Sequence, residues 1–208
     1  MKKLFIPLFC ILFISSQAQE PTAAFDGHSW EAPYHLPVPE GWGIERFLIP
    51  IGFAPAITYK GVEDIRFTPG WAKPTSDEYW TYAFLWYLDG KININEKIIE
   101  QNLKSYYTGL YAINTPDSTK AAVGKLQPVV TAFQTIATTS GDLATYSGTI
   151  HMVDYLQQKP ITLNCIVHYR LCTETNKTIV FYELSPQPFT HSNWKSLNQI
   201  WLNFTCKK

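Results

Sequence analysis

The sequence predicts an α+β domain: an antiparallel sheet of about six to seven strands with one long central helix and one C-terminal helix packed on it. Three observations support this class. One strand segment is apolar on both faces, one segment has the apolar period of a long helix, and four strand segments follow each other closely near the C-terminus. Short links join antiparallel neighbours, whereas parallel strands need long crossovers, so the last four strands should form a meander.

The N-terminal half begins with short elements. Residues Glu45–Ile49 (ERFLI) form a candidate first strand that Pro50 ends. The next stretch, Pro50–Pro74, contains four prolines and three glycines, which break it into turns and short extended pieces. Within it, Ile65–Thr68 is a second candidate strand.

The strongest strand signal covers Tyr79–Leu88 (YWTYAFLWYL). Alternation places Trp80, Tyr82, Phe84, Trp86 and Leu88 on one face, and the other face is also apolar. A strand that is apolar on both faces is typical of the centre of a covered sheet. Asp89–Gly90 then supplies a turn.

A long helix is expected next. Asn93 with Glu96 fits an N-terminal capping pattern, and Asn114–Thr115–Pro116 ends the helix. Its apolar residues recur at spacings of four, three, four and three, which predicts one continuous buried stripe: Ile99, Leu103, Tyr106, Leu110 and Ile113.

The C-terminal part carries the meander and the second helix. The four strand segments are Val129–Thr138, Leu143–Val153, Ile161–Cys172 and Thr178–Leu184. A helix then starts near Thr190 or Ser192, with an apolar stripe formed by Trp194, Leu197, Trp201 and Phe204.

Two resemblances accompany this pattern. The PEGW entry at Pro39–Trp42, the meander and the closing helix with Trp194 and Phe204 together resemble the PsbP-like fold, whose members mostly bind partners or have unknown roles. The segment Gly52–Trp71, followed by YWTYAFLWYLDG, resembles a motif of exported bacterial proteins of uncharacterised activity. Neither resemblance assigns a function, because one fold serves many.

The N-terminus has the three parts of a secretory signal in order. Lys2 and Lys3 precede the apolar run Leu4–Ile14, and Ser16 and Ala18 suit cleavage after residue 18. The run is too short for a membrane anchor, and Cys10 lies inside it, where a lipidated cysteine would not be placed. We therefore expect residues 1–18 to be a signal peptide, 19–43 an extended lead-in and 44–208 one domain, exported to the periplasm or the extracellular space.

Charge and motifs exclude several function classes. Removing the signal changes the formal net charge from 0 to −2, which gives no basic surface for nucleic acid or anionic lipid. No nucleophile elbow, phosphate-binding loop or dinucleotide fingerprint occurs, and the histidines show no zinc-ligand spacing. We expect no cofactor, no metal, no catalytic residue and no membrane span after cleavage.

The mature chain keeps Cys165, Cys172 and Cys206. Three thiols allow three pairings and leave one over. Cys165 and Cys172 are seven residues apart in one strand and should point to opposite faces, so they are not expected to bond. If a disulfide forms outside the cytoplasm, we favour Cys172 with Cys206.

One segment could form a binding site. The loop-rich segment Gly52–Trp71 combines aromatic residues, prolines and a few charges, and the candidate binding residues are Phe53, Tyr59, Glu63, Arg66 and Trp71. The alternative is that Arg66 pairs with Glu63 or Asp64 and that the aromatic residues close the open end of the core. The leading hypothesis is an exported non-catalytic binding or interaction domain, with an envelope or extracellular ligand or protein as its partner.

Two other functions remain open. A small hydrolase could use a site assembled across the sheet from His151, Asp154 and His168, provided that these side chains reach one another. The third hypothesis is a structural envelope component without a small ligand.

Overall fold

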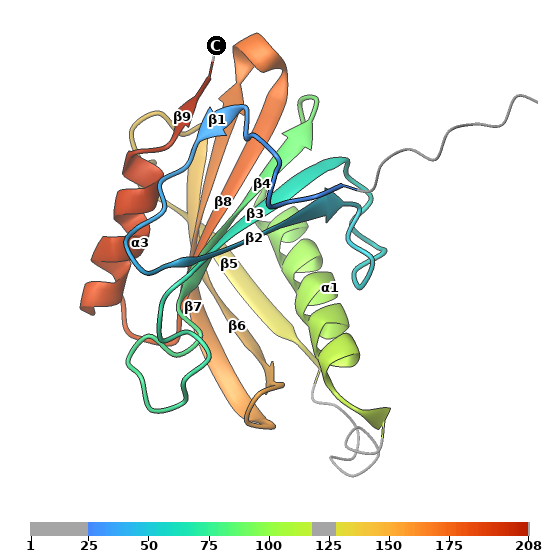
Figure 1. Ribbon diagram of the computed structural model, residues 1–208, viewed down its shortest axis with the longest axis vertical. Coiled ribbons are helices and arrows are strands. Elements are labelled where there is room, and N and C mark those ends of the chain that lie inside the picture. Colours follow the sequence, from blue (N-terminus) through green and yellow to red (C-terminus); the bar gives the residue numbers. More distant parts are fainter. Residues whose placement is uncertain (1–24, 118–127, 208) are drawn as a thin grey trace, which may run out of the picture.

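A computed structural model describes residues 25–117 and 128–207, and all further statements refer to these residues. Within them, seven antiparallel strands form one sheet in the order β2-β3-β4-β8-β7-β6-β5 (Figure 1). The strands are β2 (Gly43–Ile49), β3 (Gly61–Phe67), β4 (Tyr82–Asp89), β5 (Val130–Ile136), β6 (Ala144–Asp154), β7 (Lys159–Cys172) and β8 (Lys177–Ser185). The predicted α+β class is confirmed.

Two meanders make up this sheet. Strands β2, β3 and β4 pair in chain order, and so do β5, β6, β7 and β8, as the short links predicted. The two meanders join where β4 pairs with β8, from Tyr82 opposite Leu184 to Asp89 opposite Lys177. Strand β4 therefore lies inside the sheet, and its residues 82–88 are all buried, which explains why both of its faces are apolar.

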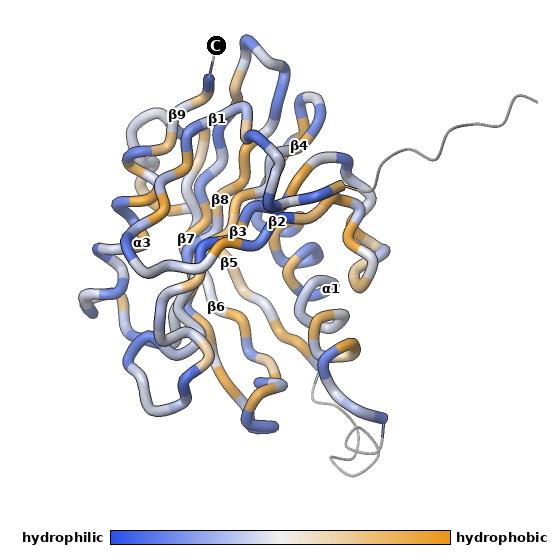
Figure 2. Tube along the Cα trace, in the orientation of Figure 1, coloured by the Kyte–Doolittle hydropathy of each residue, from blue (hydrophilic) through white to orange (hydrophobic). Residues whose placement is uncertain are grey.

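The helices cover opposite faces of the sheet. Helix α1 (Glu96–Asn114) lies on one face and helix α3 (Ser192–Leu202) on the other (Figure 1). Each covers its own cluster of buried side chains, which includes Phe84 and Trp86 beneath α1 and Leu85 and Phe181 beneath α3. Figure 2 shows hydrophobic residues recurring along α1 and along the strands that it covers. Neither helix has the length and apolar character that a membrane span requires.

Helix α1 differs from the expectation at both ends. Asn95 is its N-cap, not Asn93, because the Asn95 side chain accepts a hydrogen bond from the Ile98 backbone N–H at 3.0 Å. Toward the C-terminal end, the buried positions are Tyr107 and Tyr111, and Ile113 is 62% exposed. The stripe drifts because the helical period is 3.6 residues rather than 3.5.

Helix α3 follows the predicted stripe. Trp194, Leu197, Trp201 and the following Phe204 are buried in one cluster. The helix begins at Ser192, and His191 is its N-cap, with its side chain accepting from the Asn193 N–H.

The described part of the lead-in, residues 25–43, packs against the rest of the domain. Tyr34–His35 forms strand β1, which pairs with β9 (Thr205–Cys206) near the C-terminus. Tyr34 is 2% exposed and donates a hydrogen bond to Asp64 at 3.0 Å. The expected signal peptide, residues 1–18, lies outside the described residues.

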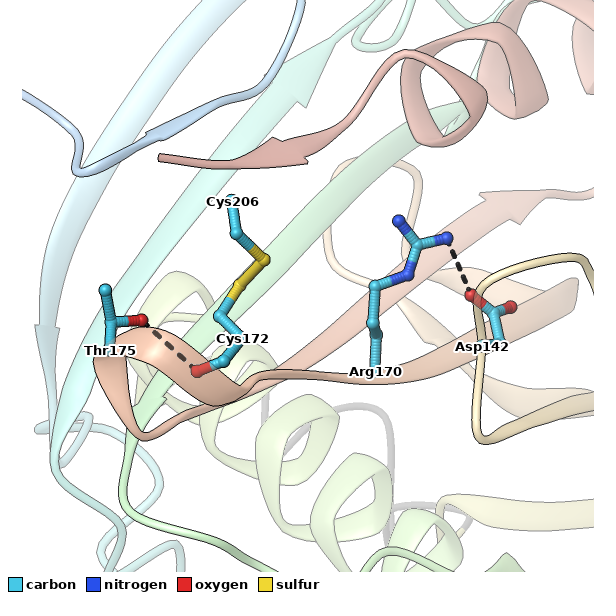
Figure 3. The surroundings of a disulfide bond; sticks show 5 residues. All are labelled: Asp142, Arg170, Cys172, Thr175 and Cys206. Atoms are coloured by element: carbon cyan, nitrogen blue, oxygen red, sulfur yellow. Dashed lines mark hydrogen bonds and ion pairs between the residues drawn. A yellow bond between two sulfur atoms is a disulfide. The ribbon is translucent and has the colours of Figure 1, made fainter. Parts of the chain in front are cut away.

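A disulfide joins the same corner to the sheet. Cys172 at the end of β7 is bonded to Cys206 of β9, with their Cα atoms 5.8 Å apart (Figure 3). This is the pairing that the sequence favoured. The short 3-10 helix η1 (Thr173–Thr175) follows Cys172, and Cys165 is a free, buried thiol on the opposite face of β7.

Candidate functional site

A cavity of about 270 Å³ lies between helix α1 and the sheet face that α1 covers. Eight of its thirteen lining residues are aromatic: Phe47, Phe53, Phe67, Trp71, Trp80, Tyr82, Tyr106 and Tyr155. They come from β2, β3, β4 and α1 and from three connecting segments, so the fold rather than any local motif brings them together. An apolar, aromatic cavity of this kind is typical of small-molecule sites.

One wall comes from the loop between β3 and β4, which is held by its own hydrogen bonds. The Gly70 N–H donates to the Glu78 carboxylate at 2.8 Å, and the Trp80 N–H donates to the Trp71 carbonyl at 2.8 Å. A Cβ at Gly70 would lie 2.2 Å from the Ser76 hydroxyl, so this close approach requires glycine. The loop thereby fixes Trp71 and Trp80 with their ring planes perpendicular and 6.4 Å apart.

Trp80 has two unusual features. Its φ is +53°, in the left-handed region that is unfavourable for a residue with a side chain. Its side chain is 1% exposed, yet the indole Nε1–H has no hydrogen-bond partner within the described residues. Buried donors are usually satisfied, and strained backbone is concentrated at functional sites, so both features draw attention to this position.

The opposite wall depends on a glycine in helix α1. A Cβ at Gly109 would lie 1.8 Å from the Phe53 carbonyl oxygen, so only glycine lets the Phe53 segment pack onto the helix. Phe53 then contacts Tyr106 edge-to-face at 5.2 Å between ring centroids. Glycine is unfavourable inside a helix, and here its use is explained by this contact.

The floor beneath the cavity contains a buried carboxyl group. Glu63 is fully buried, and its oxygens accept from Trp86 Nε1 at 2.8 Å and from the Tyr106 hydroxyl at 2.7 Å. Burial raises the pKa of Glu63 to about 8 although both hydrogen bonds act in the other direction. Glu63 is therefore mostly neutral at pH 7, and the floor of the cavity carries little charge.

The mouth of the cavity is more polar. Glu45 of β2 lines it with an exposed side chain and makes no ion pair within the described residues. Asn114 and the largely exposed Ile113 line it from the end of α1. Glu45 carries the only formal charge in the lining.

Two of the five predicted binding residues line the cavity, and three do not. Phe53 and Trp71 line the cavity. Tyr59 and Glu63 lie on the same face but behind the lining, where Tyr59 packs on Trp86 at 6.3 Å. Arg66 does not belong to the site, because side chains alternate along β3 and Arg66 points to the α3 face.

Glu63 and Asp64 were expected in a loop-rich segment and Arg66 in the short strand Ile65–Thr68 within it, but all three are buried in strand β3. On the α3 face Arg66 forms an ion pair with Asp64, which was the alternative interpretation of this segment. Asp64 also accepts from Arg46 Nε at 3.0 Å. Arg66 in turn donates to the backbone carbonyls of Pro37 and Leu36.

The residues of the hydrolase alternative do not come together. His151 and His168 share a face, but their partners in the β6–β7 register, Thr162 and Thr145, show that they lie six residues apart along the strands. This spacing corresponds to about 20 Å. Asp154 points to the opposite face, where it accepts a hydrogen bond from the Tyr79 hydroxyl. The catalytic site of the hydrolase alternative is therefore not assembled.

His168 instead belongs to a buried ionic cluster under helix α3. Its Nδ1 lies 2.7 Å from Asp142 and its Nε2 lies 3.2 Å from Glu183. Burial alone would lower the pKa of His168, but the hydrogen bonds with both carboxylates outweigh it and raise this pKa. Arg170 also pairs with Asp142 at 3.1 Å (Figure 3). None of the cavities that we describe borders the cluster.

Other hollows are less suited to a small ligand. One of them, about 670 Å³, lies over Trp30 and Leu48 and is rimmed by the charged Lys60, Asp89 and Lys177. A second, about 460 Å³, lies around His151. In the part of the chain that the structure describes, no group of three His, Cys, Asp or Glu side chains could hold a metal ion.

Sequence reasoning missed Glu45, Phe47, Trp80, Tyr106 and Tyr155 as site residues. Alternation placed Trp80 and Tyr82 on one face of the predicted strand Tyr79–Leu88, but nothing local joins them to Tyr155, which lies in the β6–β7 turn. Comparison with protein-family models, curated proteins and solved structures gives no match for this chain.

Proposed function

We propose that this protein is an exported, non-catalytic binding domain that takes a small, largely apolar molecule into the cavity between α1 and the sheet. The observation that carries the proposal is the set of eight aromatic side chains around about 270 Å³ of space. Burying such surfaces against a ligand releases about 25 cal/mol per Å² of apolar area.

The proposal is tested with the neutral fluorescent probe N-phenyl-1-naphthylamine. We expect saturable binding with one site per chain. Leu110→Trp should reduce it strongly, because Leu110 lines the cavity and the indole ring would occupy part of it. Absence of saturable binding by a folded protein would contradict the proposal.

A second variant covers the case in which the larger side chain disturbs folding. Ile113→Asp places a charge at the cavity mouth on a residue that is 62% exposed, so the fold should tolerate it. The matched control is Leu202→Asp, which changes a residue 56% exposed at the end of α3, away from the cavity. Ile113→Asp should weaken probe binding and Leu202→Asp should not.

Export is tested separately from binding. When the full chain is expressed with a secretion system, the mature protein should begin at Gln19, which intact mass measures directly. A protein that keeps residues 1–18 after secretion would contradict the proposed signal peptide.

A further inference from the structure

The lining of the cavity combines aromatic rings with a single charge, and that charge is negative. No Lys or Arg side chain is among the thirteen lining residues, whereas the Glu45 carboxylate is. Aromatic faces carry partial negative charge and attract cations, most strongly at Trp. From this lining we infer that the cavity selects organic cations, such as quaternary ammonium compounds that bear an apolar or aromatic group.

The arrangement of the rings supports this ligand class. Trp80 stands at 90° to Trp71 and at 76° to Tyr155, with centroids 6.4 Å and 5.3 Å apart. Phe67 lies 4.6 Å from Trp71 and closes the row on the β3 side. Trp80 is buried by these contacts, so the ring surface open to a ligand comes from the half-buried Phe67, Trp71 and Tyr155, and such ring faces attract cations.

The Glu45 carboxylate is free to act on a ligand. Its side chain is exposed and has no ion-pair partner in the described part of the chain, so its charge is not neutralised by the protein. Burial raises the pKa of Tyr155 to about 12, and the charges of Asp154 and Glu45 add to this shift. Glu45 is itself a lining residue, so its negative charge opposes anions and favours cations at the cavity wall.

The neighbouring charges do not reverse this preference. Arg46 follows Glu45 in the chain, but it points to the other face and pairs with Asp64 there. Arg66 is turned to that face as well. Glu63 beneath the floor is mostly neutral at pH 7, so it neither attracts nor repels a cation strongly.

This inference rests on the proposed function and is tested with a pair of ligands that differ only in charge. The cation is 3-hydroxyphenyltrimethylammonium and its neutral isostere is 3-tert-butylphenol. Both compete with N-phenyl-1-naphthylamine for the wild-type protein. We expect the cation to bind about tenfold more tightly, which corresponds to the energy of a partly desolvated cation–π contact.

Two variants separate the sources of the preference. Glu45→Gln should lower the ratio of the two affinities about two- to fivefold, the range of an exposed charge pair. Trp71→Leu should weaken the cation more than its neutral isostere, because the aromatic face is lost while an apolar side chain remains. The control Glu40→Gln removes an exposed charge that is not in the lining and should leave the ratio unchanged.

The outcomes distinguish the two proposals. If the fluorescent probe and the neutral ligand bind but the cation binds no more tightly, the inference is overturned and the proposed function stands. If neither the probe nor either ligand of the pair binds, both are overturned. A cation preference that survives both Glu45→Gln and Trp71→Leu would also overturn the assignment, because it would arise elsewhere on the protein.

Discussion

The two faces of the sheet bury polar groups in different ways. On the α3 face, charges are paired: Asp64 with Arg66 and Arg46, and His168 with Asp142 and Glu183. On the α1 face, the fully buried carboxyl group of Glu63 has no ion-pair partner among the described residues, and burial raises its pKa to about 8. The α3 face is tied to the C-terminus by a disulfide, whereas the α1 face keeps an aromatic cavity.

The difference indicates a division of roles between the faces. Removing one partner of a buried charge pair is strongly destabilising. Such pairs therefore fix the arrangement of the elements that contribute them. An aromatic wall with spare volume loses packing contacts, which is unfavourable unless a ligand restores them. We therefore interpret the α3 face as the part that holds the fold together and the α1 face as the part that binds.

The largest expected effect is the loss of a charge on the α3 face. Asp64→Asn leaves Arg66, which is 1% exposed, without an anionic partner, and should lower the free energy of unfolding by about 3–5 kcal/mol. The control Asp89→Asn breaks the exposed pair with Lys177 and should change it by less than about 1 kcal/mol. Urea unfolding at pH 7 measures both, and equal effects would contradict the assignment of Asp64.

The next largest effect concerns the disulfide. Cys172 and Cys206 are 34 residues apart in sequence, and cross-linking a loop of this length stabilises a domain by about 3–4 kcal/mol in the chain-entropy account. The double variant Cys172→Ala with Cys206→Ala should show this loss, and dithiothreitol should then have no further effect. Below its melting temperature the variant should still bind the probe, since the cavity lies on the other face.

A further effect, at most about 1.4 kcal/mol per pH unit, depends on pH and is expected on the α1 face. The folded chain keeps the Glu63 proton up to about pH 8, whereas the unfolded chain loses it near 4.5. Unfolding therefore releases a proton between these values, and stability must fall as pH rises, by at most about 1.4 kcal/mol per pH unit. Glu63→Gln should remove this slope.

The comparison of wild type with Glu63→Gln isolates the contribution of Glu63 to the pH dependence of the free energy of unfolding. His168 and Glu183 also have raised pKa values, and both withdraw stability as pH rises, but they are present in both proteins. The difference in the free energy of unfolding between wild type and variant should therefore move in favour of the variant from pH 5 to pH 8. A constant difference would show that Glu63 is charged in the folded state.

Several elements could be predicted because their signals are local. Strand β4 is apolar on both faces, the α3 stripe is regular, and short links define the meander. Glu63 and Asp64 of β3 were placed outside the expected strand Ile65–Thr68, since a strand that buries Glu63, Asp64 and Arg66 is explained only by its partners. Those partners, such as Tyr34 and Tyr106, lie 30 and 43 residues away in the chain.

The cavity could be predicted only in part. Phe53 and Trp71 were found because they lie in one unusual segment, whereas Tyr155 and Tyr106 come from the β6–β7 turn and from α1. Their meeting depends on how α1 crosses the sheet, and on the contact between Gly109 and the Phe53 carbonyl. No spacing in the sequence encodes that contact.

The division between the faces is tested most directly by the indole N–H signals in a ¹H–¹⁵N spectrum, assigned with single Trp→Phe variants. Trp71 and Trp80 line the cavity, whereas Trp194 and Trp201 are buried residues of α3 on the other face of the sheet. On titration with 3-tert-butylphenol, we predict that the signals of Trp71 and Trp80 shift and those of Trp194 and Trp201 stay in place. Shifts at Trp194 and Trp201 without shifts at Trp71 and Trp80, or no shift at all at saturating ligand, would contradict the account.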